Sequence, residues 1–517
     1  MTKNTLMVSV CLTALVAGTV ATGAAADDRP DLVVAVTKLT PHFDPMGANS
    51  NVNERVGENI VENLIRYDWK TGETVPGLAT AWKMVDPTTL ELTIRDGVAC
   101  HDGTDFTAED VEIMFGPQRY GTEDNQGPGY KIAQQFFNTI KAVTALDGNR
   151  IRIETYEPDA LLINRLSGWM GQVPCADAYL AADGWDAWGQ TVIGTGPYRI
   201  AENKPGEFHR FEAFGDYWGE PAPAASITYK VVPETAARIA GLISGEYDFI
   251  TEIQPDQFKT IDDNPGTVIA GGPIRNIRII VYDTRHPALQ DPRVRRALNL
   301  AINRELLVEA VFGGKTDVPN GMQVPAFGDI YLEDFQGATY DPDAARALLD
   351  AAGYDGTEIS YRYLKDYYTG EVSTAQILEQ MWGEVGLNVK LELKENWGQI
   401  EEDDVAEGRG IVNWSSTVYF NDPIGHSHRI FGPTGFFQVH GFWDGSAFNA
   451  AADSGLFSTD LETRRTAFRE MLDIFEAEAP GTYLHVLPMY YGKKESIAWE
   501  SSGTGLMDFR AGALAFE

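Results

Sequence analysis

His426 and His428 stand two residues apart and are the residues whose types and spacing best suit metal chemistry. Neutral imidazoles bind transition metals and metal chelates. Alternate positions on a strand would share a face, but Pro423 and Gly425 predict a loop, and neither a cysteine nor an evident third ligand is nearby. Structural or surface histidines are therefore the favoured interpretation, and the sequence predicts no metal site.

The motifs of nucleotide-binding proteins and hydrolases are each broken at a defining position. Gly194 and Gly196 could begin a G-x-G-x-x-G dinucleotide fingerprint, but Arg199 occupies the position of its third glycine. Residues 314–316 could end a G-x-x-x-x-G-K-S/T phosphate loop, but Glu309 occupies the position of its first glycine. The G-x-S-x-G and H-E-x-x-H motifs are absent. A glycosidase-like acid pair could lie among the 75 carboxylates, but nothing singles out one pair. We expect no catalytic residues and no cofactor.

Acidic residues outnumber basic ones, 75 Asp and Glu against 41 Lys and Arg, and the net charge is −34 over 517 residues. This charge argues against nucleic acid and anionic membrane surfaces as partners. It does not identify a cationic ligand, because an acidic surface commonly serves solubility. The acidic run 401–404 predicts a solvated helix face.

The first residues have the layout of a secretion signal. Lys3 is followed by a mostly apolar run over 6–20, which is short for a membrane span, and Ala24-Ala25-Ala26 offers a cleavage site. Val10 precedes Cys11, whereas a lipobox needs a small residue there. We expect a signal peptide over 1–26 and a periplasmic protein without a lipid anchor; a short N-terminal membrane anchor is the alternative.

Cys100 and Cys175 are the two cysteines outside this signal. An oxidising compartment allows a disulfide between them, but sequence does not give their separation. A disulfide and two buried thiols remain equally open.

Local patterns predict alternating strands and helices. The run 31–36 predicts a strand, 52–64 a helix, and 107–115 a helix that Thr107 caps with Asp110 in the box position. Further strands are expected at 151–155, 277–282, 387–393 and 482–487, and further helices at 236–243, 292–304, 342–352 and 374–385. Alternation of this kind indicates an α/β fold, and the chain is too long for one core.

Five ordered blocks of the sequence resemble the extracytoplasmic solute-binding proteins of the peptide/nickel/opine class (family 5), which serve ABC importers. The most informative block, 94–111, has the order strand, polar turn at His101-Asp102-Gly103, and helix start. The other blocks lie at 194–198 with 216–219, at 244–248, at 291–304 and at 340–354.

This resemblance implies a two-lobe clamp of the large periplasmic-binding-protein type (type II-like) with a discontinuous first lobe. The chain would cross between lobes near residues 274 and 493. The expected division is 27–62, 191–274 and 493–517 for the lobe I core, 63–190 for an extra lobe I subdomain, and 275–492 for lobe II. The expected partners are a small solute and an inner-membrane permease with its ATPase, and the protein is expected to be a monomer.

The resemblance also indicates where a ligand would bind. The aligned positions are mainly aromatic and polar: Phe43, Tyr367, Tyr368, Trp397, Trp414, Ser415, Ser416, Thr417, Tyr419 and Tyr490. In peptide-binding members a carboxylate stands three residues after the equivalent of Trp414 and pairs with the peptide ammonium. Here that position is Thr417, and a hydroxyl cannot supply that ion pair in a desolvated cleft.

The function that follows is capture of a small peptide-like or opine-like solute by hinge closure. Aromatic faces also stack on sugars or hold cations, so an oligosaccharide, a cationic metabolite or a metal chelate remains an alternative ligand. An exported hydrolase or a receptor-coupled sensor is the alternative from a different functional class.

Overall fold

The computed structural model describes residues 28–47, 50–365, 367–403, 408–419 and 421–517. The predicted signal peptide over 1–26 lies outside the described residues.

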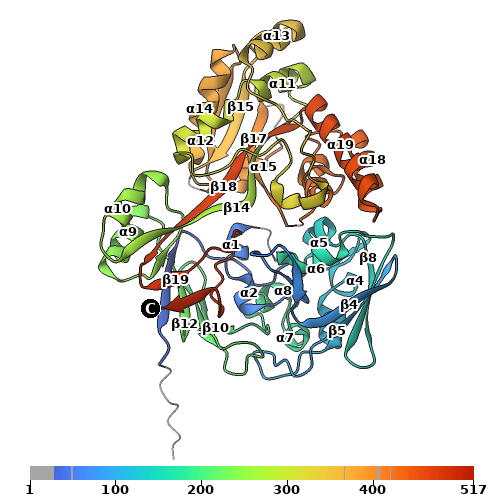
Figure 1. The fold of residues 1–517 in the computed structure, drawn as a ribbon, viewed down its shortest axis with the longest axis vertical. Helices are drawn as coiled ribbons and strands as arrows, with labels where there is room; N and C mark the ends of the chain where they lie inside the picture. The colour runs from blue at the N-terminus through green and yellow to red at the C-terminus, as the bar shows by residue number, and fades with distance from the viewer. Residues whose placement is uncertain (1–27, 48–49, 366, 404–407, 420) are drawn as a thin grey trace, which may run out of the picture.

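A ten-stranded sheet runs through both lobes of the molecule (Figure 1). Its strands follow the order β10-β11-β12-β1-β13-β18-β14-β17-β15-β16. In that order they are Tyr198–Lys204, Phe208–Ala213, Ser226–Val231, Asp31–Val36, Phe249–Ile250, Gly481–Lys494, Thr267–Tyr282, Arg409–Thr417, Ile359–Leu364 and Val389–Lys394. Strand β1 pairs in parallel with β12 and β13, and β15 pairs in parallel with β16 and β17.

The long antiparallel strands β14 and β18 connect the two lobes (Figure 1). Their register runs from the pair Thr267–Lys494 in the lower lobe to Val281–Gly481 in the upper lobe, with shifts near Pro273 and Arg278. Two strands that cross side by side allow one lobe to move against the other while both remain part of one sheet.

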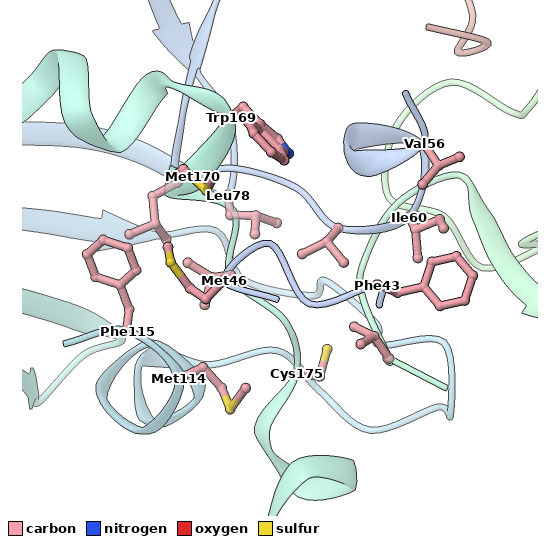
Figure 2. Packing of buried hydrophobic residues seen from close by; sticks show 14 of the residues in the cluster. Phe43, Met46, Val56, Ile60, Leu78, Met114, Phe115, Trp169, Met170 and Cys175 are labelled. Carbon is pink, nitrogen blue, oxygen red and sulfur yellow. The ribbon is translucent and has the colours of Figure 1, made fainter. Parts of the chain in front are cut away.

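The lower lobe, which we call lobe I, also contains a four-stranded sheet and short helices. That sheet has the order β4-β5-β9-β8, with strands Ala79–Asp86, Thr89–Ile94, Arg150–Thr155 and Ile140–Leu146. The helices are α3 (Ala108–Met114), α4 (Pro117–Tyr120), α5 (Tyr130–Phe136), α6 (Leu162–Ser167), α7 (Ala176–Ala181), α8 (Trp185–Trp188), α9 (Thr235–Ser244) and α10 (Phe258–Asp262). One apolar core joins the four-stranded sheet and helices α3 to α8, and Figure 2 shows Phe43, Val56 and Ile60 packed in it. Helices α9 and α10 pack in a separate apolar cluster.

The upper lobe, lobe II, surrounds its part of the sheet with helices, several of which are longer than those of lobe I. They are α11 (Pro292–Leu300), α12 (Arg304–Phe312), α13 (Pro342–Ala352), α14 (Glu371–Glu384), α15 (Trp397–Glu401), α16 (Pro423–Phe431), α17 (Phe436–Val439), α18 (Ser446–Leu456) and α19 (Leu461–Glu478). Helices α11 and α13 begin with an aspartate cap followed by proline, and α13 ends at Gly353 with a φ of 67°. The α/β two-lobe fold expected from the sequence is confirmed.

Two local predictions were wrong. The run 52–64 is not one helix, but two short ones, α1 (Asn51–Glu54) and α2 (Gly57–Ile60). The carbonyl of Ile60 accepts from the amide of Gly196, and the Asn63 side chain donates to the Leu166 and Gly168 carbonyls. Contacts with distant residues therefore replace the helical bonds that the local pattern favoured.

The loop predicted around His426 and His428 is also wrong, because both histidines lie in α16. Asp422 caps this helix by accepting from the amide of Gly425 at 3.0 Å. Pro423 takes the first helical position, where its missing N–H breaks no bond. Proline and glycine here mark the start of a helix.

Cys100 and Cys175 are joined by a disulfide with an S–S distance of 2.00 Å. The bond links the turn that leads to α3 with the residue before α7. The structure therefore has the first of the two states that the sequence left open.

Across the described residues, no helix combines the length and apolar character needed to cross a membrane.

Candidate solute-binding site

A cavity of about 340 Å³ lies between the lobes. One wall comes from the segment that follows β1 and from the start of α1 in lobe I, and the other comes from lobe II. The lobe I residues are Lys38, Leu39, Pro41, Ser50 and Val52. The lobe II residues are Tyr367, Tyr368, Trp397, Glu401, Trp414, Ser415, Thr417, Tyr419, Arg429 and Ile430. A solute in this space would contact both lobes at once.

Two tryptophans form the centre of the lobe II wall. The rings of Trp397 and Trp414 meet edge to face, with centroids 4.8 Å apart. Asn396 caps α15 and places Trp397 at its first position, whereas Trp414 lies on β17 and stacks on Phe436 at 4.8 Å. The rings are held by packing on several sides, so they present a preformed apolar surface.

Hydroxyl groups border this aromatic surface. The Tyr368 hydroxyl donates to Ser415 Oγ at 3.0 Å, and the Tyr367 ring lies 5.0 Å from that of Trp397. Burial raises the pKa of Tyr367 to about 12, so its phenol stays protonated at neutral pH. The wall therefore offers neutral donors and acceptors beside apolar faces.

The structure brings seven of the ten residues predicted to contact ligand to this cavity. They are Tyr367, Tyr368, Trp397, Trp414, Ser415, Thr417 and Tyr419. Tyr490 lines a smaller neighbouring cavity of about 50 Å³. That cavity shares Lys38, Val52, Tyr367 and Tyr368 with the larger one.

Two predicted residues lie away from both cavities. The Phe43 ring points into the lobe I core, 4.8 Å from His209 and 5.8 Å from Phe211 (Figure 2). The Ser416 hydroxyl is buried 3.1 Å from His426 Nε2. The loop that contains Phe43 does reach the cavity, but through Leu39 and Pro41. For Phe43 and Ser416, ligand contact stays a prediction without support from the cavity lining.

Charged residues in the lining were missed by sequence reasoning. Arg429 lies in α16 next to His428, and Glu401 belongs to the acidic run 401–404 that the sequence predicts to face solvent. Glu401 is half-buried, and desolvation raises the pKa of its carboxyl group. Lys38 follows β1 and is exposed at the lobe I side. No local pattern distinguishes these charges from surface ones.

Two other arginines near the cleft, Arg55 and Arg278, are paired with carboxylates. Arg55 contacts Glu252 in the smaller cavity, and Arg278 lies 3.7 Å from Glu371 beneath Tyr368. Burial raises the pKa of Glu371, while the Arg278 charge opposes this shift. These pairs balance their own charge and act as structure.

The two histidines of α16 are buried and neutral. Burial lowers the pKa of His426 to about 3 and that of His428 to about 4. His428 Nε2 lies 3.9 Å from Asp453, and no cluster of three metal-ligating side chains occurs within the described ranges. The arrangement fits helix packing.

Sequence comparison assigns the chain to a family. The profile of bacterial extracellular solute-binding proteins, family 5 (middle region), matches residues 73–438. The chain belongs to this family. It is a solute-binding protein of the class that serves ABC importers.

Individual relatives agree with this assignment. The glutathione-binding protein GsiB of Pectobacterium atrosepticum is 26% identical over 469 residues, which cover 88% of each chain. The dipeptide-binding protein of Pseudoalteromonas sp. SM9913, solved with Met-Leu, has a TM-score of 0.82 at 20% identity and covers 94% of this chain and 100% of its own. The periplasmic binding protein DppA of Helicobacter pylori, solved with the peptide STSA, has a TM-score of 0.81 at 20% identity and covers 95% and 99%.

Proposed function

We propose that this protein captures a small peptide-like or opine-like solute between its lobes and delivers it to an ABC permease. The observation that carries the proposal is the interlobe cavity, to which lobe I contributes five lining residues and lobe II ten. Binding would hold the lobes together and expel water, and opening would release the solute.

The proposed hinge is the pair of crossing strands β14 and β18. Their register pairs Pro273 with Pro488, which supports a crossing near residue 274 and a return crossing near 488, five residues before the predicted 493. Tyr490 then belongs to lobe I, and residues 63–190 would be an added part of that lobe. Two contacts join the lobes beside this hinge: the Gly370 amide donates to Gln254 Oε1 at 2.8 Å, and the Tyr490 hydroxyl donates to the Lys315 carbonyl at 3.1 Å.

The ligand class is supported by the names of the relatives and by the cavity wall. GsiB is named for glutathione, and the Pseudoalteromonas protein was solved with Met-Leu. Thr417 lines the cavity at the position where peptide-binding members have a carboxylate for the peptide ammonium. This difference favours a solute that does not depend on an ammonium group. The aromatic wall also suits an oligosaccharide, which is the second candidate.

The remaining parts of the proposal concern the protein's setting. Signal cleavage after Ala26 would give a monomeric periplasmic protein without catalytic residues. Its partners would be the solute, the permease and the associated ATPase. The acidic surface, with a net charge of −34, suits a protein that diffuses freely near an anionic membrane.

The test is native mass spectrometry of the protein purified from its own periplasm, followed by a thermal-shift screen of peptides, opines, sugars and metal chelates. A bound solute raises the melting temperature by mass action. We expect a co-purified mass or a concentration-dependent shift from a peptide or opine. A sugar or chelate as the sole ligand would contradict the proposed ligand class. No mass and no shift would contradict solute capture itself.

A further inference from the structure

Arg429 is a buried cation in the wall of the interlobe cavity. It projects from α16, is 6% exposed, and lines the cavity together with Thr417 and Tyr419. Desolvation lowers its pKa, but a guanidinium starts so high that it remains charged. A buried charge of this kind needs a compensating group.

The protein compensates this charge only in part. Arg429 Nη2 donates to the Thr417 carbonyl at 3.4 Å, and the guanidinium lies 4.7 Å from the Tyr419 ring and 5.4 Å from the Phe136 ring. Arg429 Nε has no hydrogen-bond partner within the described part of the chain. Rings and a carbonyl stabilise a cation, but they do not neutralise it.

The neighbouring arginines differ in this respect. Arg55 contacts Glu252, and Arg278 is within 3.7 Å of Glu371. No carboxylate of the described residues forms such an ion pair with Arg429. Among the residues that line the larger cavity, Lys38 adds a second positive charge and Glu401 a negative one. The positive charge at Arg429 is therefore left for a bound molecule.

We infer that the solute carries an anionic group, a carboxylate, that pairs with Arg429, while the aromatic wall holds its remaining body. A guanidinium presents two parallel N–H donors to a carboxylate, and such a bond in a water-excluded cavity is stronger than one between neutral groups. Thr417 cannot neutralise Arg429 or attract an ammonium group, so the site favours solutes that carry a negative charge. This inference rests on the proposed function and narrows its substrate class.

The test combines the solute panel with three matched probes: Met-Leu, N-acetyl-Met-Leu, which keeps only the carboxylate charge, and Met-Leu amide, which keeps only the ammonium. Dissociation constants are measured by isothermal titration calorimetry. We expect the stabilising solutes to be anionic and the acetylated dipeptide to bind more tightly than the amide. In Arg429→Gln, affinity for anionic solutes should fall roughly 10- to 100-fold.

Three variants serve as controls. Arg429→Lys keeps the charge but not the paired donors and should lose less affinity than Arg429→Gln. Thr417→Asp places a carboxylate beside Arg429 and should weaken the binding of anionic solutes, although the arginine is still present. Arg346→Gln removes an exposed arginine on α13 that pairs with Asp343, and it should bind as wild type does. Circular dichroism shows whether each variant folds.

The outcomes separate this inference from the proposed function. A neutral or cationic solute that binds wild type and Arg429→Gln equally would overturn the anionic site and leave solute capture intact. Preference for the amide over the acetylated dipeptide would also overturn it. Failure of every panel member to bind the folded wild type would overturn solute capture, and the inference with it.

Discussion

Glu54 is a buried carboxyl group next to the lobe I wall of the cavity, and it is only 4% exposed. Desolvation raises its pKa to about 7, although hydrogen bonds from the Gly505 backbone and the Thr504 side chain oppose this shift. The pKa of a glutamate in the unfolded chain is 4.5, so the folded state holds the proton more tightly. Its contribution to stability is complete below pH 4.5 and is lost as the pH rises through 7.

Glu54→Gln should therefore stabilise the protein increasingly as the pH rises. An amide keeps the shape of the protonated acid and never ionises. From the two pKa values, the gain in unfolding free energy relative to wild type should be near zero at pH 4 and on the order of 3 kcal/mol at pH 8. Urea denaturation at several pH values measures it. The control is Glu305→Gln, which changes an exposed glutamate. A gain from Glu54→Gln that is the same at every pH would contradict a protonated Glu54.

At the scale of elements, two aspartates that cap helices differ in burial, and therefore in how much each contributes to the free energy of unfolding. Asp422 caps α16 and contacts Arg464, and both side chains are buried. Asp460 caps α19 by accepting from the Thr463 amide at 2.8 Å, but it is exposed. The two residues share one local role in different surroundings.

Asp422→Ala should cost about 3 kcal/mol or more of unfolding free energy, because it also leaves the Arg464 charge buried without its partner. Asp460→Ala should cost about 1 kcal/mol, the usual value of an exposed cap. Chemical denaturation of both variants gives the comparison. Equal losses would show that the Asp422–Arg464 pair adds nothing beyond the cap.

The disulfide acts at the same scale by joining two parts of lobe I that are 75 residues apart. Closing so long a loop restricts the unfolded chain, which commonly stabilises a protein by about 2–5 kcal/mol. Reduction with dithiothreitol should lower the melting temperature of the wild type. The double variant Cys100→Ser/Cys175→Ser should melt at a lower temperature than the oxidised wild type. The double variant should not respond to dithiothreitol, and a response there would point to another cause.

The whole molecule is organised around movement of one lobe against the other. Contacts between the described lobes include the Gln254–Gly370 hydrogen bond and the packing of Tyr419 of lobe II on the rings of Phe136 and Trp169, at 5.1 and 5.7 Å. Contacts of this kind are made in the closed form, so they set the balance between open and closed states.

Gln254→Ala should shift that balance toward the open form. The loss of one interlobe hydrogen bond, about 1 kcal/mol, should reduce solute affinity roughly fivefold. Small-angle X-ray scattering should show a larger radius of gyration for this variant without solute. Gln380→Ala, on the exposed face of α14, is the control, and an unchanged radius and affinity in Gln254→Ala would assign closure to other contacts.

The sequence by itself determined the α/β class, the family and many of the elements. The strand over 31–36, the capped start of α3 and the aspartate-proline starts of α11 and α13 all depend on a few adjacent residues. Capping, proline placement and alternation are local effects, so they can be read without knowing what lies across the core.

Only the tertiary structure decided which side chains face the cavity. Phe43 was expected to contact the ligand but turns into the lobe I core, while Arg429, twelve residues beyond Thr417, reaches the cavity from α16. The helix expected over 52–64 gave way to bonds with residues near 166 and 196. In each case the outcome depends on contacts between segments far apart in the chain, and no local pattern encodes those contacts.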